Sequence, residues 1–104
     1  MVVFAPFCRM EVRLAVTRGA RLRGLIAQRN VTPLLLAPAR SVHTCGMRVP
    51  IDVVFLDAEL RVVKVVRGMA PWRFAAARGA RAVLELKAGG AEGVGEGDRL
   101  ELRP

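Results

Sequence analysis

The segment Ile51-Asp52-Val53-Val54-Phe55-Leu56 constrains the fold more than any other part of the sequence. It follows Pro50, and proline suits the first residue of a strand. Its apolar side chains would occupy both faces of a strand, so we expect both faces to be covered by other parts of the chain. Asp52 interrupts this run, and a buried carboxylate is costly unless it is paired or hydrogen-bonded. The segment therefore predicts an internal strand that carries a satisfied carboxylate.

Several other short segments have the composition or the alternation of strands. A hairpin turn at residues 57–60 would join the run 51–56 to the β-branched run that follows it, although this turn lacks the usual glycine. Glycines between residues 89 and 97 indicate loops and turns. The remaining predicted strands cover residues 10–16, 34–36, 62–66, 82–86 and 100–102.

Residues 18–29 have the pattern of an amphipathic helix. Leu22, Leu25 and Ile26 are spaced at i, i+3 and i+4, which places them on one apolar stripe, whereas the neighbouring arginines lie off it. We predict that this is the only helix longer than two turns, and that no other helix of that length occurs in residues 42–86.

The order of these elements predicts a mainly β fold in a single domain over residues 1–104. We expect a small barrel-like or strongly curled sheet of about six or seven strands. The one amphipathic helix near the N-terminus would then cover an end or an open edge of the sheet. The regular strand–helix alternation of a doubly wound fold is absent from the pattern. Because 53% of the residues are hydrophobic, a substantial core is expected.

The chain is strongly basic, with 17 Lys and Arg against 9 Asp and Glu, a formal charge of +8. Such a charge indicates either a basic surface that binds a polyanion or a set of charges spread over a solvated surface. No block of five or six like charges occurs, which favours the second interpretation. Base-stacking aromatics are scarce, with four Phe, one Trp and no Tyr. We therefore predict no specific nucleic-acid partner, and any binding to DNA or RNA should be nonspecific and salt-sensitive.

Cysteine usage and the apolar runs favour a cytoplasmic protein that does not enter a membrane. Cys8 and Cys45 could form one bridge, but two cysteines do not make the disulfide framework of a secreted domain. The first residues lack the pattern of a signal peptide. The longest uncharged apolar run, 31–39, is interrupted by two prolines and is far shorter than the roughly 20 residues of a spanning helix.

Four segments, 23–25, 42–57, 83–89 and 93–98, occur in an order that is similar to that of a known family. Together they span about residues 10–102, and the segment 42–57 is the most specific of them. The chain resembles the small bacterial and archaeal family called domain of unknown function 192. The resemblance implies a β-rich, barrel-like fold and brings no established catalytic or binding residues. It departs at Cys45, where the family tends to have an aromatic residue, so it does not support a thiol-dependent activity.

Asp52 is the most informative candidate for a site residue. In a structural role it would accept backbone amides or pair with an arginine, and so fix a loop. In a functional role it would be an acid that faces a ligand. The nearest candidate partners in sequence are Arg48 and the amides of residues 43–47.

His43 is the only histidine, and in an extended segment it would project to the same side as Cys45. With Asp52 as the orienting acid, the pair would have the arrangement of a thiol nucleophile. No Asn or Gln lies nearby for an oxyanion hole, and the alternative is a partly exposed histidine on a loop. Three Cys and His in total are too few for a structural zinc site, so we predict no metal, and no cofactor is indicated.

Trp72 either covers an edge of the core or, if it is exposed, anchors a partner. Our preferred interpretation is a small β-barrel module that binds a small ligand or a protein partner. The first alternative is an enzyme that uses a cluster of Asp52, His43 and Arg48, and the second is a nonspecific polyanion binder. A pocket containing that cluster would favour the enzyme. The candidate ligand-binding residues are His43, Cys45, Arg48, Asp52 and Trp72.

Overall fold

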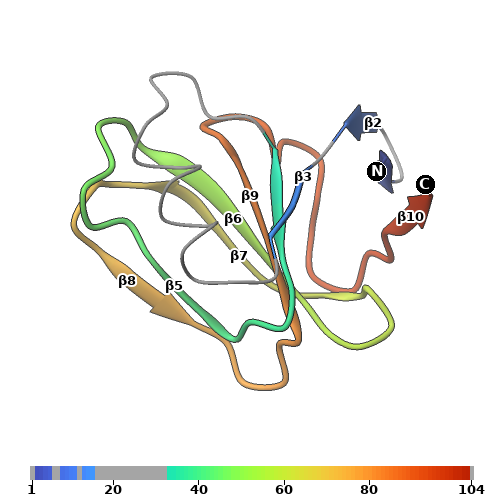
Figure 1. Ribbon diagram of the computed structural model, residues 1–104. Coiled ribbons are helices and arrows are strands. Elements are labelled where there is room, and N and C mark those ends of the chain that lie inside the picture. The colour runs from blue at the N-terminus through green and yellow to red at the C-terminus, as the bar shows by residue number, and fades with distance from the viewer. Residues whose placement is uncertain (1, 6–7, 12, 16–32, 104) are drawn as a thin grey trace.

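The computed structural model describes residues 2–5, 8–11, 13–15 and 33–103, which form ten strands in three sheets (Figure 1). The largest sheet has five strands in the order β3-β4-β9-β6-β7 and is antiparallel except for the parallel pair β3–β4. Its strands are β3 (Arg13–Ala15), β4 (Leu34–Leu36), β9 (Ala82–Lys87), β6 (Ile51–Leu56) and β7 (Val62–Met69).

Two smaller sheets complete the described fold. One has the order β10-β1-β2, and the other is the antiparallel pair β5–β8. The strands of the first are β10 (Glu101–Arg103), β1 (Val2–Ala5) and β2 (Cys8–Glu11), and those of the second are β5 (Ser41–His43) and β8 (Phe74–Ala76).

The structure confirms a mainly β fold and corrects its details. The described residues form ten strands rather than about six or seven. The five-stranded sheet has β3 at one edge and β7 at the other, so it is open and not a closed barrel. The predicted strand 10–16 contributes to two strands in different sheets, because β2 pairs with β1 whereas β3 pairs with β4. The predicted helix at 18–29 lies outside the described residues, and residues 42–86 contain no helix, as predicted.

Strand β6 occupies the position that its sequence predicts, because it pairs with β9 on one side and with β7 on the other. All six of its residues are buried. Alternate side chains point to opposite faces of a strand. The residues at 51, 53 and 55 therefore face one side of the sheet, and Asp52, Val54 and Leu56 face the other.

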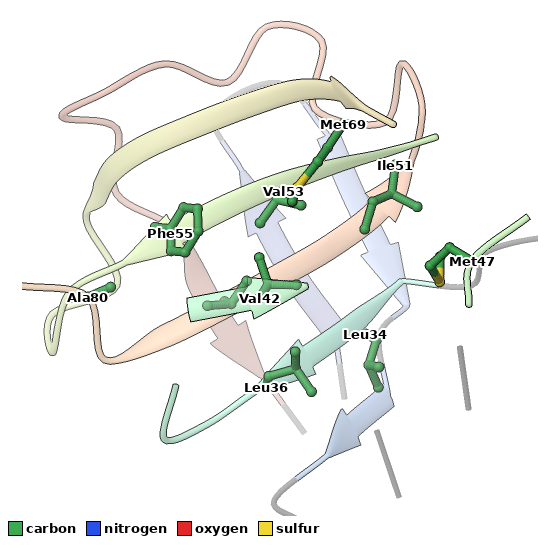
Figure 2. Packing of buried hydrophobic residues seen from close by; sticks show 10 residues of the cluster. Leu34, Leu36, Val42, Met47, Ile51, Val53, Phe55, Met69 and Ala80 are labelled. Atoms are coloured by element: carbon green, nitrogen blue, oxygen red, sulfur yellow. The ribbon is translucent and has the colours of Figure 1, made fainter. Parts of the chain in front are cut away.

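Each face of the sheet has its own hydrophobic core. The first core includes Ile51, Val53 and Phe55 of β6, and Figure 2 shows these side chains together with Val42 of β5. The second core lies on the other face of the sheet. Its buried residues are Leu35, Val54, Leu56, Val62, Ala82, Leu84, Leu86, Ala91, Val94 and Leu100.

The β5–β8 pair is attached to the five-stranded sheet mainly through the first core. Val42 is 1% exposed, and the partly buried Ala75, its partner in the β5–β8 register, also packs against this core. At the next residue of β8, the carbonyl oxygen of Ala76 accepts a hydrogen bond from Lys64 Nζ of β7 at 2.9 Å. The inner face of the pair is therefore buried, and its outer face is left to solvent.

The predicted hairpin turn between β6 and β7 forms without a glycine. Asp57 Oδ1 accepts hydrogen bonds from the backbone N–H groups of Glu59 and Arg61, both at 2.9 Å. Leu60 has a φ of 62°, the left-handed conformation that glycine usually supplies in such turns. The side chain of Asp57 thus stabilises a turn that its sequence only weakly specifies.

We predict that Val42→Ala lowers the free energy of unfolding by about 2 kcal/mol, because it removes two buried carbon atoms and leaves a cavity between β5 and β6. Ala76→Ser, on the exposed face of β8, is the control and should leave the melting temperature unchanged. Equal melting temperatures for Val42→Ala and the parent protein, measured by thermal denaturation, would show that the β5–β8 pair does not depend on this contact.

Candidate functional site

Asp52 is buried near the start of β6, with 2% of its surface exposed. Its Oδ1 accepts a hydrogen bond from the backbone N–H of Gly68 at 2.9 Å. Its Oδ2 accepts hydrogen bonds from the backbone N–H groups of Gly89 and Ala91, both at 3.0 Å. Hydrogen bonds to a charged acceptor are stronger than those between neutral groups, so three amides compensate for much of the lost hydration.

The three donors to Asp52 come from two separate parts of the chain. Gly68 has a φ of 61° and lies in β7 opposite an irregularity in the β6–β7 register, as expected of a β-bulge. The other two amides belong to the loop that follows β9. Arg67, next to the bulge, donates from its guanidinium to the carbonyl oxygens of Ala91 and Val94 in the same loop. The loop after β9 is thus held in two ways: its backbone N–H groups donate to Asp52, and its carbonyl oxygens accept from Arg67.

The structure corrects the predicted partners of Asp52. Arg48 and the amides of residues 43–47 are the nearest candidates in sequence, but the observed donors are the amides of Gly68, Gly89 and Ala91. The prediction that this carboxylate is buried is confirmed, and of the two structural partners that were open, backbone amides or an arginine, the observed ones are amides. Among the described residues, both of its oxygens are engaged in fixing the backbone.

We predict that Asp52→Ala lowers the free energy of unfolding by about 1–3 kcal/mol, because it leaves buried amide donors without an acceptor. Asp52→Asn should lose less, since its single carbonyl oxygen can still accept from Gly89 and Ala91. Chemical denaturation of the two variants measures this difference. If both variants unfold at the same denaturant concentration as the parent protein, the three hydrogen bonds contribute nothing to stability.

Thr44 is completely buried and connects the end of β5 to the segment before β8. Its hydroxyl donates a hydrogen bond to the carbonyl oxygen of Ala70 at 2.7 Å and accepts one from the N–H of Arg73 at 2.8 Å. Its backbone N–H donates to the Arg73 oxygen at 2.9 Å, and its carbonyl oxygen accepts from the N–H of Trp72 at 3.0 Å. Residues 70–73 are therefore fixed by one threonine. Thr44 was not among the predicted site residues, because an isolated Thr beside a three-residue strand carries no recognisable signal in the sequence.

We predict that Thr44→Val lowers the free energy of unfolding by about 1–3 kcal/mol, because the isosteric side chain cannot replace either hydroxyl hydrogen bond. Thr44→Ser keeps the hydroxyl and is the matched control, with a smaller expected loss. Hydrogen exchange of the Arg73 amide should be faster in Thr44→Val than in Thr44→Ser. Identical exchange in the two variants would contradict the role of the hydroxyl.

His43 and Cys45 are both exposed, on either side of the buried Thr44, as the predicted alternation requires. His43 Nδ1 accepts a hydrogen bond from the backbone N–H of Cys45 at 3.3 Å. A neutral ring in this arrangement carries its proton on Nε2, so Nδ1 is not available as a base for the thiol. Cys45 is a free thiol. Asp52 cannot orient this pair, because it lies on the second-core side of β6 whereas β5 packs on the first core.

Trp72 and Phe74 are the large hydrophobic side chains that the structure leaves exposed, at 67% and 71% of their surface among the described residues. Phe74 lies directly opposite His43 in the β5–β8 register. Trp72 has a φ of 62°, a conformation that costs a non-glycine residue about 1–2 kcal/mol. Trp72 therefore does not cover the core. The exposed side chains of His43, Cys45, Trp72, Arg73 and Phe74 are called the β5–β8 surface below.

Charge is unevenly distributed around this surface. Residues 12–51 and 60–84 contain no Asp or Glu, so no acidic residue belongs to β5, to β8 or to the chain that flanks them. The exposed acidic side chains among residues 33–101 are Glu59, in the β6–β7 turn, and Glu92, Glu96 and Glu101, after β9. Figure 1 shows β5 and β8 on one side of the molecule and these acidic segments on the other. The exposed arginines in the chain segments that contain or flank β5 and β8 are Arg40, Arg48, Arg73, Arg78 and Arg81.

The structure does not bring all of the predicted site residues together. His43, Cys45 and Trp72 lie on the β5–β8 surface, and the exposed Arg48 follows shortly after Cys45. No hydrogen bond or ion pair joins Asp52 to His43 or Arg48 among the described residues.

Of a depression, a metal-ligating group and a membrane-spanning helix, only a depression occurs among the described residues, and it lies away from the β5–β8 surface. An open depression of about 510 Å³ is lined by Glu59, Leu60, Arg99, Leu100 and Glu101, on the acidic side. No group of three or more His, Cys, Asp or Glu that could hold a metal ion occurs in the described part of the chain. Within the same residues, no helix is long and apolar enough to cross a membrane.

Comparison with known proteins identifies the family. The model of the domain of unknown function 192 (DUF192) family, described as "Uncharacterized ACR", matches residues 5–102. The chain belongs to this family, as the order of its sequence segments suggested. No protein with a curated description shows significant similarity to it.

Two solved structures are similar to this fold. A protein of unknown function from Novosphingobium aromaticivorans DSM 12444 has 23% sequence identity and a TM-score of 0.82, over 97% of this chain and 82% of its own. A protein from Sinorhizobium meliloti 1021, provisionally named a transcription regulator, also has 23% identity and a TM-score of 0.82, over 96% of this chain and 89% of its own. At this level of identity the likeness shows the shared fold and nothing about activity.

Proposed function

We propose that this protein is a binding module that recognises an anionic partner through the β5–β8 surface. The observation that carries the proposal is the exposure of Trp72 and Phe74 on a surface with arginines and without acidic residues. Large aromatic side chains that serve only the core of a protein are normally buried. Two exposed ones close together in the sequence therefore favour an interaction surface. Trp and Arg are also the residues that most often dominate binding energy at interfaces.

The backbone under the β5–β8 surface is suited to binding because it is already fixed. Thr44 orders residues 70–73 through four hydrogen bonds of 2.7–3.0 Å, so Trp72 and Arg73 need little further ordering when a partner arrives. Preorganisation of this kind increases affinity because less conformational entropy is lost on association. The strained φ of Trp72 is consistent with a functional position, since strained residues concentrate at such sites.

The geometry gives less support to the other interpretations of the sequence. A catalytic cluster of Asp52, His43 and Arg48 would need contacts that the described residues do not make, because the Asp52 oxygens bind backbone amides. The open depression on the acidic side contains none of the predicted site residues, so it does not support a small-ligand site at those residues. The provisional name of the Sinorhizobium protein is compatible with an anionic partner and adds no evidence of its own. The cytoplasmic location stays a prediction.

The proposal predicts that binding to heparin, a flexible polyanion, depends on where arginines are removed and not only on how many. Arg48→Ala/Arg73→Ala should bind heparin roughly 2- to 30-fold more weakly than the parent protein, the range expected for two exposed charge contacts. Arg61→Ala/Arg99→Ala removes the same charge on the acidic side and should bind nearly as well as the parent protein. Calorimetric titration measures the affinities, and equal losses in the two double variants would exclude the β5–β8 surface as the binding site.

A further inference from the structure

We propose that the anionic partner is a single strand of nucleic acid, whose bases stack on Trp72 and Phe74 while neighbouring arginines contact its phosphates. This inference rests on the binding function proposed above and names the class of its partner. Single-strand-binding surfaces combine exposed rings, on which successive bases stack, with cations that contact the backbone. The β5–β8 surface provides both in one place.

The arrangement of the rings supports stacking. Phe74 faces His43 across the β5–β8 pair, and directly opposite residues of an antiparallel pair have Cβ atoms about 4.5–5.5 Å apart. Trp72 lies two residues before Phe74, and its backbone is fixed by the hydrogen bond from its N–H to the Thr44 oxygen at 3.0 Å. Phe74 and His43 thus lie side by side on the exposed face of the pair, and the exposed Trp72 lies in the turn that leads into β8.

The charges beside the rings are suited to a phosphate backbone. Arg73 lies between the two exposed aromatics in sequence, and Arg40 is joined to the far end of β8 by the hydrogen bond from the Ala77 N–H to its carbonyl oxygen at 3.1 Å. Guanidinium groups bind phosphate in a planar, two-point manner and also stack on bases. No acidic residue lies in residues 60–84 or 12–51 to repel the phosphates.

The surface predicts binding without sequence preference. Residues 40–51 and 70–81 contain no Asn or Gln, the side chains that recognise adenine edges, and the arginines of this region are assigned to phosphate contacts. Stacking on an aromatic ring tolerates any base, because every base has a π-face. The expected ligand is therefore an unpaired strand of any sequence, since the bases of a duplex are not free to stack on protein rings.

The composition of the chain offers a direct readout. Trp72 is the only Trp and the chain has no Tyr, so its intrinsic fluorescence reports on the proposed site alone. Titration of the full chain with a 12-nucleotide oligothymidine should quench this fluorescence to saturation. If three phosphates are contacted, the affinity should fall about 20-fold between 50 and 200 mM salt. A blunt-ended DNA duplex should quench much less.

Variants separate stacking from charge. Phe74→Leu keeps an apolar side chain but loses the ring, and it should weaken oligothymidine binding at least about 5-fold and heparin binding by a smaller factor, because heparin has no bases to stack. Arg73→Ala should weaken the binding of both oligothymidine and heparin. Arg99→Ala, the matched control on the acidic side, should weaken the binding of neither. Circular dichroism and melting temperature establish that each variant is folded.

Competing partners give distinguishable results. If polyphosphate or a polyglutamate peptide binds as tightly as oligothymidine, with no loss in Phe74→Leu, the nucleic-acid inference is overturned and the anionic binding function stands. If vesicles containing phosphatidylglycerol bind with a blue shift of the Trp72 emission and oligothymidine does not bind, the partner is a membrane surface and the inference is likewise wrong. If neither heparin nor oligothymidine binds, the proposed function itself fails.

Discussion

The rest of the structure depends on the carboxylate of Asp52, which is buried between strands and accepts three backbone amides. Because the donors belong to β7 and to the loop after β9, one side chain fixes the relative position of three parts of the chain. Arg67 completes the connection by binding carbonyl oxygens of the same loop. A charged group is tolerated in this internal strand because its hydrogen bonds replace the water that folding removes.

The same end of β7 leads directly to the exposed aromatic residues. Asp52 binds Gly68, Thr44 binds Ala70 two residues later, and Trp72 follows after two more. Two of the buried polar residues, Asp52 and Thr44, therefore act from opposite faces of the sheet, and both restrain the segment that ends at Phe74. We infer that Asp52 and Thr44 stabilise the segment that leads to the β5–β8 surface.

How much of the fold and of the site could be predicted from the sequence depends on how far apart along the chain the interacting residues lie. Strand β6 has the limits that its apolar run predicts, because a run covered on both faces leaves a continuous signal in the sequence. Strands β5 and β8 were missed, since each has only three residues, of which one in β5 and none in β8 is buried. The burial of Asp52 was predictable from its neighbours, but its donors were not, because they lie 16, 37 and 39 residues away. Trp72 was a candidate from composition alone, and only the fold shows that it is exposed beside Phe74.

Among the described residues, the exposed acidic side chains lie away from the β5–β8 surface, so this part of the charge distribution is polarised in addition to the net charge of +8. A dipole acts before contact, because its torque turns the molecule while the partner is still several ångströms away. An approaching polyanion would therefore meet the β5–β8 side more often than random collision allows. The gain would appear in the association rate, which falls as salt screens the field, whereas the dissociation rate would depend mainly on the contacts formed once the partner is bound.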